Sequence, residues 1–497
     1  MFFSLNQTRE TLTSTRMRRT LMDMDPDQGK IQKPSQAFLE YFRCPDEFVL
    51  FQSQSQGPKY KTFFRFGSAT CYGSLEGDRG SIFPGTVESD VTPPLESIRS
   101  GEIDLRFDPD EVVRNLRYER YVARGEREQL LQTLYYFLRP ILPLPVRKRL
   151  QRRVFQQRLG RKFPHWPVDC SVDQIFQQLM GLTLLASGGS EIPFIWFWPE
   201  GSDCALMMTH DVEEQNGADL CDFLMDLDDS CGIKAAFQLI PEGAYEDFDT
   251  LASKIRARSF ELNIHDLDHD GRLYEHKELF EARASRINEY GRRYGAQGFR
   301  SGSMHRNQDW FEMLDFQYDM SVPTVSHLEP QSGGCCTVTP YFVGNVMELP
   351  LTTIQDHGLF HVLSANSIEL WKQQIETILA HHGLISFIVH PDYISEPTEC
   401  GFYRQLLQYI QALRTTNPIW IALPGDINRW WRERSGLQLV RDGDGWQITG
   451  RGSERARLAF ASFVDGKVIY RVVDQADANT ERMVAAVSDG NANVHPY

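Results

Sequence analysis

Residues 205–214 have the sequence ALMMTHDVEE, in which four apolar residues run directly into Thr209, His210, Asp211 and two glutamates. An apolar run that meets charge only at its end is typical of a strand buried on both faces. In α/β proteins, ionisable side chains at the C-terminal tip of such a strand are where the chemistry is usually located. The stretch therefore predicts a buried strand with functional residues at its tip.

The same pattern recurs from about residue 200 to residue 434, where short apolar runs alternate with amphipathic segments of helical length. The predicted strands are 204–209, 234–240, 260–264, 298–299, 318–322, 346–351, 384–389 and 419–423. The clearest predicted helices are 275–290, 367–381 and 402–414. This alternation predicts an α/β fold built on a parallel sheet or a (β/α) barrel.

The chain has 497 residues, which is too many for one ordinary hydrophobic core, and we expect four parts. Residues 1–35 are polar and lack periodicity, so we predict a disordered tail. Residues 36–195 are expected to form an N-terminal α+β and helical region, and residues 196–434 the barrel. Residues 435–497 are expected to form a small β appendage, with a hairpin at Asp442-Gly-Asp-Gly445.

Composition limits the classes of partner and compartment. A formal net charge of −15 argues against a general nucleic-acid-binding protein, which would carry a basic surface. The nine cysteines are irregularly spaced and include no C-x-x-C, so neither a disulfide framework nor a cysteine zinc site is indicated. No apolar window of about 18 residues predicts a transmembrane helix, and the first residues lack the order of a secretory signal. We therefore expect a cytoplasmic protein, whose oligomeric state the sequence does not fix.

The segment 146–163 carries eight basic residues between Arg147 and Lys162. One interpretation is peripheral contact with a membrane surface or an anionic glycolipid. The other is an amphipathic helix that packs its apolar residues and leaves its basic face in water. The sequence leaves both open.

Ionisable residues follow most of the predicted strands of the central part. They are His210, Asp211 and Glu213 after the first strand, His265 to His269 after the third, then Arg300, Asp319, Glu348, His390 and Asp392. In a barrel, the C-terminal tips of the strands surround one pocket. We expect these side chains to converge there.

The residue types in this set suggest a catalytic metal site. His265 and His269 are four residues apart, and on a helical turn that spacing places both imidazoles on one face. Two imidazoles and one carboxylate form a zinc site that leaves a position open for water. Asp211 and Glu213 provide carboxylates, for a ligand and a general base, and His390 provides a separate acid.

These residues resemble the motifs of the polysaccharide deacetylases, carbohydrate esterase family 4, which have a distorted (β/α) barrel. The first motif corresponds to Thr209-His-Asp-Val-Glu213 and the second to His265-Asp-Leu-Asp-His269. The third corresponds to Gly298-Phe-Arg-Ser-Gly302 and the fifth to Phe387-Ile-Val-His-Pro-Asp392. The resemblance covers about residues 200–430.

The resemblance implies a role for each matching residue. Asp211 would be the catalytic base, oriented by Arg300, and His390 the catalytic acid. His265 and His269 would be metal ligands, with Glu213 as the third where the family has aspartate and Glu214 as its competitor. For the fourth motif, which tunes the acid histidine, the candidates are Asp319 and then Asp392. Trp310 would either line a sugar pocket or pack in the core.

The resemblance implies a metal-dependent hydrolase, most simply a zinc enzyme, that acts on a non-peptide C–N (amide) bond and removes an N-acetyl group from a sugar, oligosaccharide or glycolipid. A cytoplasmic location favours a nucleotide-linked, lipid-linked or oligosaccharide precursor over a mature polymer. Two alternatives remain: an amidohydrolase of a small non-sugar amide with the same residues, and a degenerate barrel that binds glycan without catalysis.

Overall fold

Strand β6 (Cys204–Val212) is buried at every one of its nine positions. Its even-numbered apolar residues, such as Leu206 and Met208, share a core with the surrounding helices, whereas Ala205 and Met207 belong to a second core on the opposite face. The predicted strand is therefore confirmed, and it extends through Asp211 to Val212. We describe the computed structural model of the chain over residues 35–49, 51–52, 58–76, 89–94, 98, 103–122, 158, 160–443, 445–473 and 481–485.

The central sheet has nine strands, in the order β11-β12-β10-β9-β8-β7-β6-β13, with β14 also pairing with β6. All eight predicted strands are present: β6, β7 (Ala236–Leu239), β8 (Glu261–His265), β9 (Gly298–Arg300), β10 (Tyr318–Asp319), β12 (Val346–Glu348), β13 (Leu384–Ile388) and β14 (Ile419–Ile421). Their pairings are parallel. The ninth strand, β11 (Tyr341–Val343), was not predicted and pairs antiparallel with β12 at the edge.

The sheet is curled. Strands β6 and β9 are separated by β7 and β8, which would place them about 14 Å apart in a flat sheet. Yet Arg300 at the end of β9 reaches across to Asp211 on β6 with a 2.6 Å contact. The two side chains meet because the sheet bends toward the face from which they project.

Hydroxyl groups link edge strand β13 to the segment that follows β12. Thr352 donates to the Leu384 carbonyl at 2.7 Å and accepts from the Ser386 amide at 3.0 Å. The Ser386 hydroxyl donates to the Pro350 carbonyl at 2.6 Å, and the Thr352 amide donates back to that hydroxyl at 2.8 Å. These side chains satisfy backbone groups that would otherwise be unpaired in the interior.

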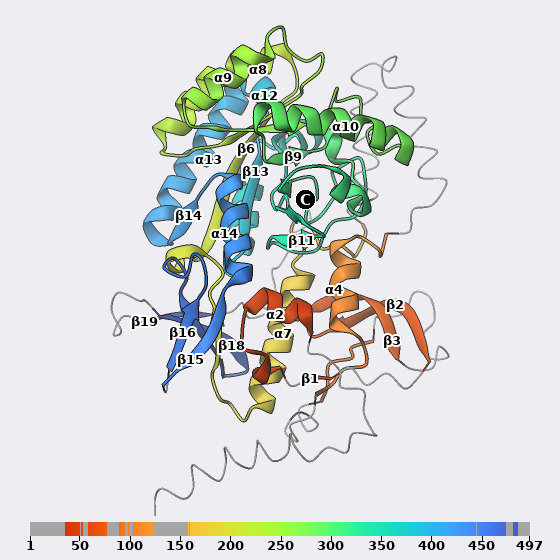
Figure 1. The fold of residues 1–497 in the computed structure, drawn as a ribbon, viewed down its shortest axis with the longest axis vertical. Coiled ribbons are helices and arrows are strands. Elements are labelled where there is room, and N and C mark those ends of the chain that lie inside the picture. The colour runs from red at the N-terminus through yellow and green to blue at the C-terminus, as the bar shows by residue number, and fades with distance from the viewer. Residues whose placement is uncertain are drawn as a thin grey trace, which may run out of the picture. The chain divides into compact units, whose positions relative to one another are not determined.

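Helices lie around the central sheet, as Figure 1 shows for α8, α9, α10 and α13 around β6, β9 and β13. The helices are α8 (Gln215–Ser230), α9 (Phe248–Ala257), α10 (Lys277–Tyr294), α11 (Glu369–Ala380), α13 (Pro397–Thr416) and α14 (Pro424–Gly436). The three predicted helices correspond to α10, α11 and α13. Apolar residues of α8, α9, α10, α11 and α13 pack against β6, β7 and β13 in one core, whereas the apolar residues of α14 belong to the other core.

The described residues of the N-terminal part form helices and short strands. It contains α2 (Gln36–Phe42), the antiparallel pair β2 (Lys59–Phe66) and β3 (Ala69–Glu76), α4 (Pro109–Arg117) and α7 (Ser171–Ala186). The predicted tail at 1–35 lies outside the described residues except for Ser35, which caps α2. So does most of the basic segment 146–163, although Arg158 donates to the Pro330 carbonyl at 3.1 Å.

The C-terminal strands form the predicted hairpin and a second sheet. Strands β15 (Gln438–Asp442) and β16 (Gly445–Thr449) pair antiparallel across the Asp442–Gly445 turn. Strands β17 (Leu458–Val464), β18 (Lys467–Val473) and β19 (Glu481–Ala485) pair in sequence, and β17 also pairs with β5 (Ile192–Ile195). The second sheet therefore includes a strand that precedes the central sheet in the chain. No helix among the described residues has the length and apolar character needed to cross a bilayer.

We expect Thr352→Val to lower the free energy of unfolding by about 1–3 kcal/mol, because valine has a similar volume but leaves the Leu384 carbonyl and Ser386 amide unpaired. Denaturant unfolding measures the change. Thr377→Val is the matched control, since Thr377 is half-buried on α11 and its hydroxyl donates to the Gln373 carbonyl of the same helix. An equal effect of the two variants would contradict a role for Thr352 in joining β13 to the rest of the sheet.

Candidate active site

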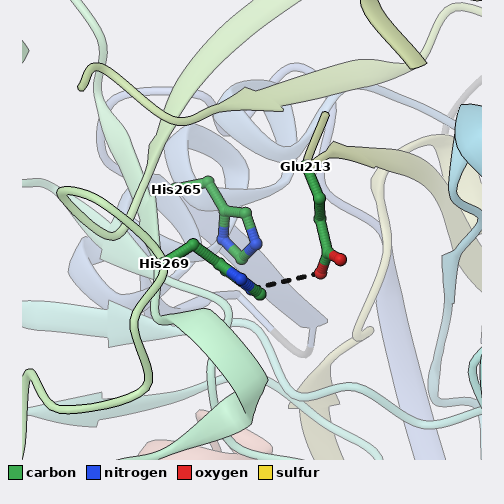
Figure 2. Close-up of side chains that lie close together, drawn as sticks. All are labelled: Glu213, His265 and His269. Carbon is green, nitrogen blue, oxygen red and sulfur yellow. Dashed lines mark ion pairs between the residues drawn. The ribbon is translucent and has the colours of Figure 1, made fainter. Parts of the chain in front are cut away.

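Glu213, His265 and His269 form a cluster whose ligand atoms all lie within 4.8 Å of one another. Figure 2 shows the three side chains pointing toward a common centre, with an ion pair of 3.1 Å between His269 Nε2 and Glu213 Oε1. Ligand atoms of a tetrahedral zinc ion with bonds of about 2.1 Å lie about 3.4 Å apart. Small side-chain rotations would therefore bring the three ligand atoms to the spacing of a zinc site. Among the described residues, this is the one group of three or more such side chains that could hold a metal ion.

The donor atoms of the cluster fit a metal. His265 Nδ1 faces the Arg300 carbonyl at 3.1 Å and must therefore carry the proton, which leaves the lone pair of Nε2 directed into the cluster. Nε2 of His265 is buried and has no hydrogen-bond partner within the described part of the chain, whereas the buried Nε2 of His269 is ion-paired with Glu213. Two imidazole nitrogens beside a carboxylate are a donor set that zinc binds.

The electrostatics of the cluster favour the protonation states of metal ligands for two of its members. Burial lowers the pKa of His265 to about 4, which keeps this imidazole neutral near pH 7. Burial acts to raise the pKa of Glu213, but His269 and His390 outweigh it and hold the pKa well below its ordinary value. Burial also opposes protonation of His269, but the Glu213 carboxylate raises the His269 pKa. A bound cation would take the place of this proton between them.

His265 and His269 were predicted to share one helical turn, but the structure places them on the end of a strand and the loop after it. His265 is the last residue of β8, whereas Asp266 and His269 both adopt left-handed conformations with φ of 55°. The chain therefore coils back over the end of the strand instead of forming a helix. Gly302 permits this approach, because a Cβ there would lie 2.8 Å from His269 Cδ2 and 2.6 Å from Asp266 Oδ2.

Asp211 and Arg300 form a buried ion pair beside the cluster. Both are at most 3% exposed, and Arg300 Nη1 contacts Asp211 Oδ1 at 2.6 Å and Thr209 Oγ1 at 2.8 Å. Burial would raise the pKa of Asp211, but Arg300, His265 and His390 together lower it, so the carboxylate is ionised at neutral pH. Its other oxygen, Oδ2, lies 3.9 Å from His265 Nε2 and thus faces the metal cluster.

His390 lies on the other side of Glu213, at the start of the short helix α12 (Pro391–Ile394). Its Nε2 is 3.6 Å from Glu213 Oε1, and its Nδ1 donates to Asp356 Oδ1 at 2.6 Å. Asp356 Oδ2 also accepts the His390 backbone amide at 2.7 Å. The carboxylate therefore fixes both the backbone and the ring of His390.

The prediction that Asp319 contacts His390 and sets its pKa is wrong. The carboxylate that contacts the His390 ring is Asp356. Asp319 lies on β10 opposite Glu348 of β12 and accepts the Ser321 amide at 2.7 Å. Burial raises the pKa of Asp319 to about 6. The second candidate, Asp392, accepts the Glu213 backbone amide at 3.4 Å, so it supports a predicted metal ligand instead of the acid.

The remaining candidates also have defined positions. Glu214 is exposed and lies outside the metal cluster, whereas Glu213 is part of it. Trp310 stacks on Tyr274 and packs against Phe280, which fits the core interpretation. Asp356 was missed because it lies eight residues past β12, in a loop that sequence periodicity does not align with any strand tip.

No family model matches the chain, and no curated protein does. Solved structures do match it, and many are polysaccharide deacetylases. One from Mycobacterium smegmatis, described as a polysaccharide deacetylase, is 17% identical with a TM-score of 0.40, over 50% of this chain and 97% of its own. The catalytic domain of a peptidoglycan N-acetylglucosamine deacetylase from Eubacterium rectale is 15% identical with a TM-score of 0.27, over 44% and 88%. Puue allantoinase is 14% identical with a TM-score of 0.38, over 47% and 92%.

Loss of a residue that only hydrogen-bonds to a metal ligand weakens metal affinity by about 10–100-fold. We expect His269→Ala to weaken zinc binding by more than this, because the variant removes a direct ligand. Isothermal titration of metal-free protein with zinc measures the affinity and the stoichiometry, expected to be one ion per chain. His276→Asn is the control, since His276 is exposed, caps α10 and pairs with Glu278 in the first turn of that helix. Unchanged affinity in His269→Ala would show that zinc binds elsewhere.

Proposed function

We propose that the chain is a metal-dependent hydrolase that removes an N-acetyl group from a sugar or glycan precursor, with residues 196–434 as the catalytic unit. The observation that carries the proposal is the juxtaposition of three groups. The Glu213, His265 and His269 cluster has Asp211 on one side, ionised and held by Arg300, and His390 on the other, held by Asp356. The motif resemblance in the sequence supports an N-acetylated sugar as the substrate class.

The cluster residues would hold the divalent cation, most simply Zn²⁺. A bound cation would supply Lewis acidity, lowering the pKa of a coordinated water and polarising the acetyl carbonyl. Nε2 of His265, Nε2 of His269 and the Glu213 carboxylate are the donors available for it. The glutamate, one methylene longer than aspartate, reaches the cluster from the residue after β6.

Asp211 and His390 divide the proton transfers. Asp211 Oδ2 faces the cluster while Oδ1 is held by Arg300, so the free oxygen is placed to accept a proton from the attacking water. His390 donates its Nδ1 proton to Asp356, so its Nε2 is the atom that faces the cluster and can protonate the departing amine nitrogen. Loss of the acetyl group as acetate then leaves the free amine.

We expect Asp211→Asn to lower kcat by about 10²–10⁴-fold, the usual contribution of a positioned general base, while zinc still binds. The measurement is acetate release from a panel of nucleotide-linked, lipid-linked and polymeric N-acetyl sugars, with small non-sugar amides included. Zinc titration and circular dichroism verify the fold, because asparagine leaves the buried Arg300 charge unpaired.

Asp315→Asn serves as the control for this variant, since Asp315 pairs with Arg292 at the surface. A wild-type chain that binds zinc but releases no acetate from any N-acetyl sugar would refute the proposal. Activity confined to non-sugar amides would assign the same machinery to a different amidohydrolase, and activity confined to polymer would exclude the precursor substrates.

We expect Asp356→Asn to move the alkaline limb of the kcat–pH profile to lower pH. Burial would lower the pKa of His390, but Asp356 and Glu213 outweigh it and raise the pKa well above its ordinary value of 6.5. A general acid acts in its protonated form, so activity falls as the pH rises through that pKa. Removing the Asp356 charge lowers the pKa and brings the fall to a lower pH.

The matched control is Asp319→Asn, which removes a buried carboxylate that makes no contact with His390 among the described interactions. This variant should leave the position of the alkaline limb unchanged. If both variants moved the limb equally, Asp356 would have no specific influence on the acid.

A further inference from the structure

Glu119 is a buried carboxylate from the N-terminal part that inserts into the loops of the central sheet. It is 7% exposed and has a left-handed backbone with φ of 56°. Its Oε2 accepts Arg306 Nε at 2.9 Å, and its Oε1 accepts Arg306 Nη2 and, at 2.5 Å, the Gly334 amide. Arg306 is itself 1% exposed, so this bidentate pair neutralises a charge in the interior.

The loop around Gly333 and Gly334 is built to admit this carboxylate. Both glycines have positive φ, 128° and 140°, and a Cβ on Gly333 would collide with Glu119 Oε1. Neighbouring residues of the same N-terminal segment also dock here. Tyr121 donates to the Gly334 carbonyl at 2.7 Å, and the Arg117 carbonyl accepts Gln308 Nε2 at 2.7 Å.

Arg306 also donates to the segment that borders the metal cluster and to Ser326. Its Nη1 donates to the Met304 carbonyl at 2.8 Å, and its Nη2 donates to Ser326 Oγ at 2.7 Å. Ser303 and Met304 both have left-handed φ, 54° and 53°, a conformation that non-glycine residues adopt only when other contacts hold it. The hydrogen bond from Arg306 is one such contact.

The other end of this segment touches the cluster. The Gly302 amide donates to Asp266 Oδ2 at 3.1 Å, and Gly302 lies against the ring of His269. The 302–306 segment is thus held at one end by Arg306 and at the other by the loop that carries both histidines. A shift of the segment would displace His269, which reaches the cluster from a loop instead of a strand.

We propose that Glu119 is a positioning residue for the metal centre, acting through Arg306 and the 302–306 segment on His269. The N-terminal part is then a component of the active unit and not a separate appendage. This inference rests on the metal centre of the proposed function, and it concerns a residue that precedes Glu213 by 94 positions and His269 by 150.

The test compares zinc affinity with stability in Glu119→Gln and Arg306→Lys. Glu119→Gln keeps the shape of the side chain but removes its charge, and Arg306→Lys keeps the charge but loses the directed donation to Met304. Zinc titration at a temperature where circular dichroism shows each variant folded gives the affinity, and thermal unfolding of the metal-free protein gives the stability. We expect each variant to bind zinc about tenfold or more weakly than wild type.

The control is Glu111→Gln. Glu111 is a carboxylate of the same N-terminal part, but it bonds to Ser74 and Asn115 within that part. The Glu111→Gln variant should lower the unfolding temperature without changing the zinc affinity. Because Glu119 and Arg306 act along one route, Glu119→Gln combined with Arg306→Lys should bind zinc no more weakly than the weaker single variant.

Wild-type zinc affinity in folded Glu119→Gln, whatever its stability, would overturn the positioning role and leave the proposed function intact. If Glu119→Gln does not fold, Arg306→Lys decides the question in the same way. A wild-type chain that binds no zinc would overturn the inference and the proposed function together.

Discussion

The buried ion pair between Asp211 and Arg300 is the constraint on which the rest of the site depends. It joins two strands that are not neighbours, so the sheet must curl for the pair to form. The curl in turn brings the ends of β6, β8 and β9 together, and the backbone of Arg300 fixes the tautomer of His265. Neither charge is tolerable alone at 3% exposure or less, so the pair and the curvature stabilise each other.

Two further buried charges near the site are also paired, Arg306 with Glu119 and His390 with Asp356. In the cluster itself, Nε2 of His265 has no hydrogen-bond partner within the described residues, and Nε2 of His269 is ion-paired with Glu213. A buried polar atom left unsatisfied is costly, and a cation bound between the two imidazoles and the carboxylate would remove that cost.

The sequence was informative wherever function coincides with a strand tip. Asp211, His265, Arg300 and His390 each follow or end an apolar run, so periodicity alone placed them at one edge. Asp356 and Glu119 have no such signal, because a loop and a distant N-terminal segment carry them, and only tertiary packing brings them to the site. The i, i+4 spacing of the histidines was taken as helical, but left-handed residues at 266 and 269 determine their approach. The pairing of β5 with β17 depends equally on long-range contacts that local pattern does not encode.

The central claim is that two imidazoles and the Glu213 carboxylate share one cation next to an acid and a base. The most direct measurement is a crystal structure of zinc-loaded protein soaked with acetate, with anomalous scattering recorded at the zinc edge. The account predicts a single strong peak about 2.0–2.2 Å from Nε2 of His265, Nε2 of His269 and a Glu213 oxygen, with acetate oxygen completing the coordination. A zinc peak elsewhere in the molecule, or coordination that omits the two histidines, would contradict it.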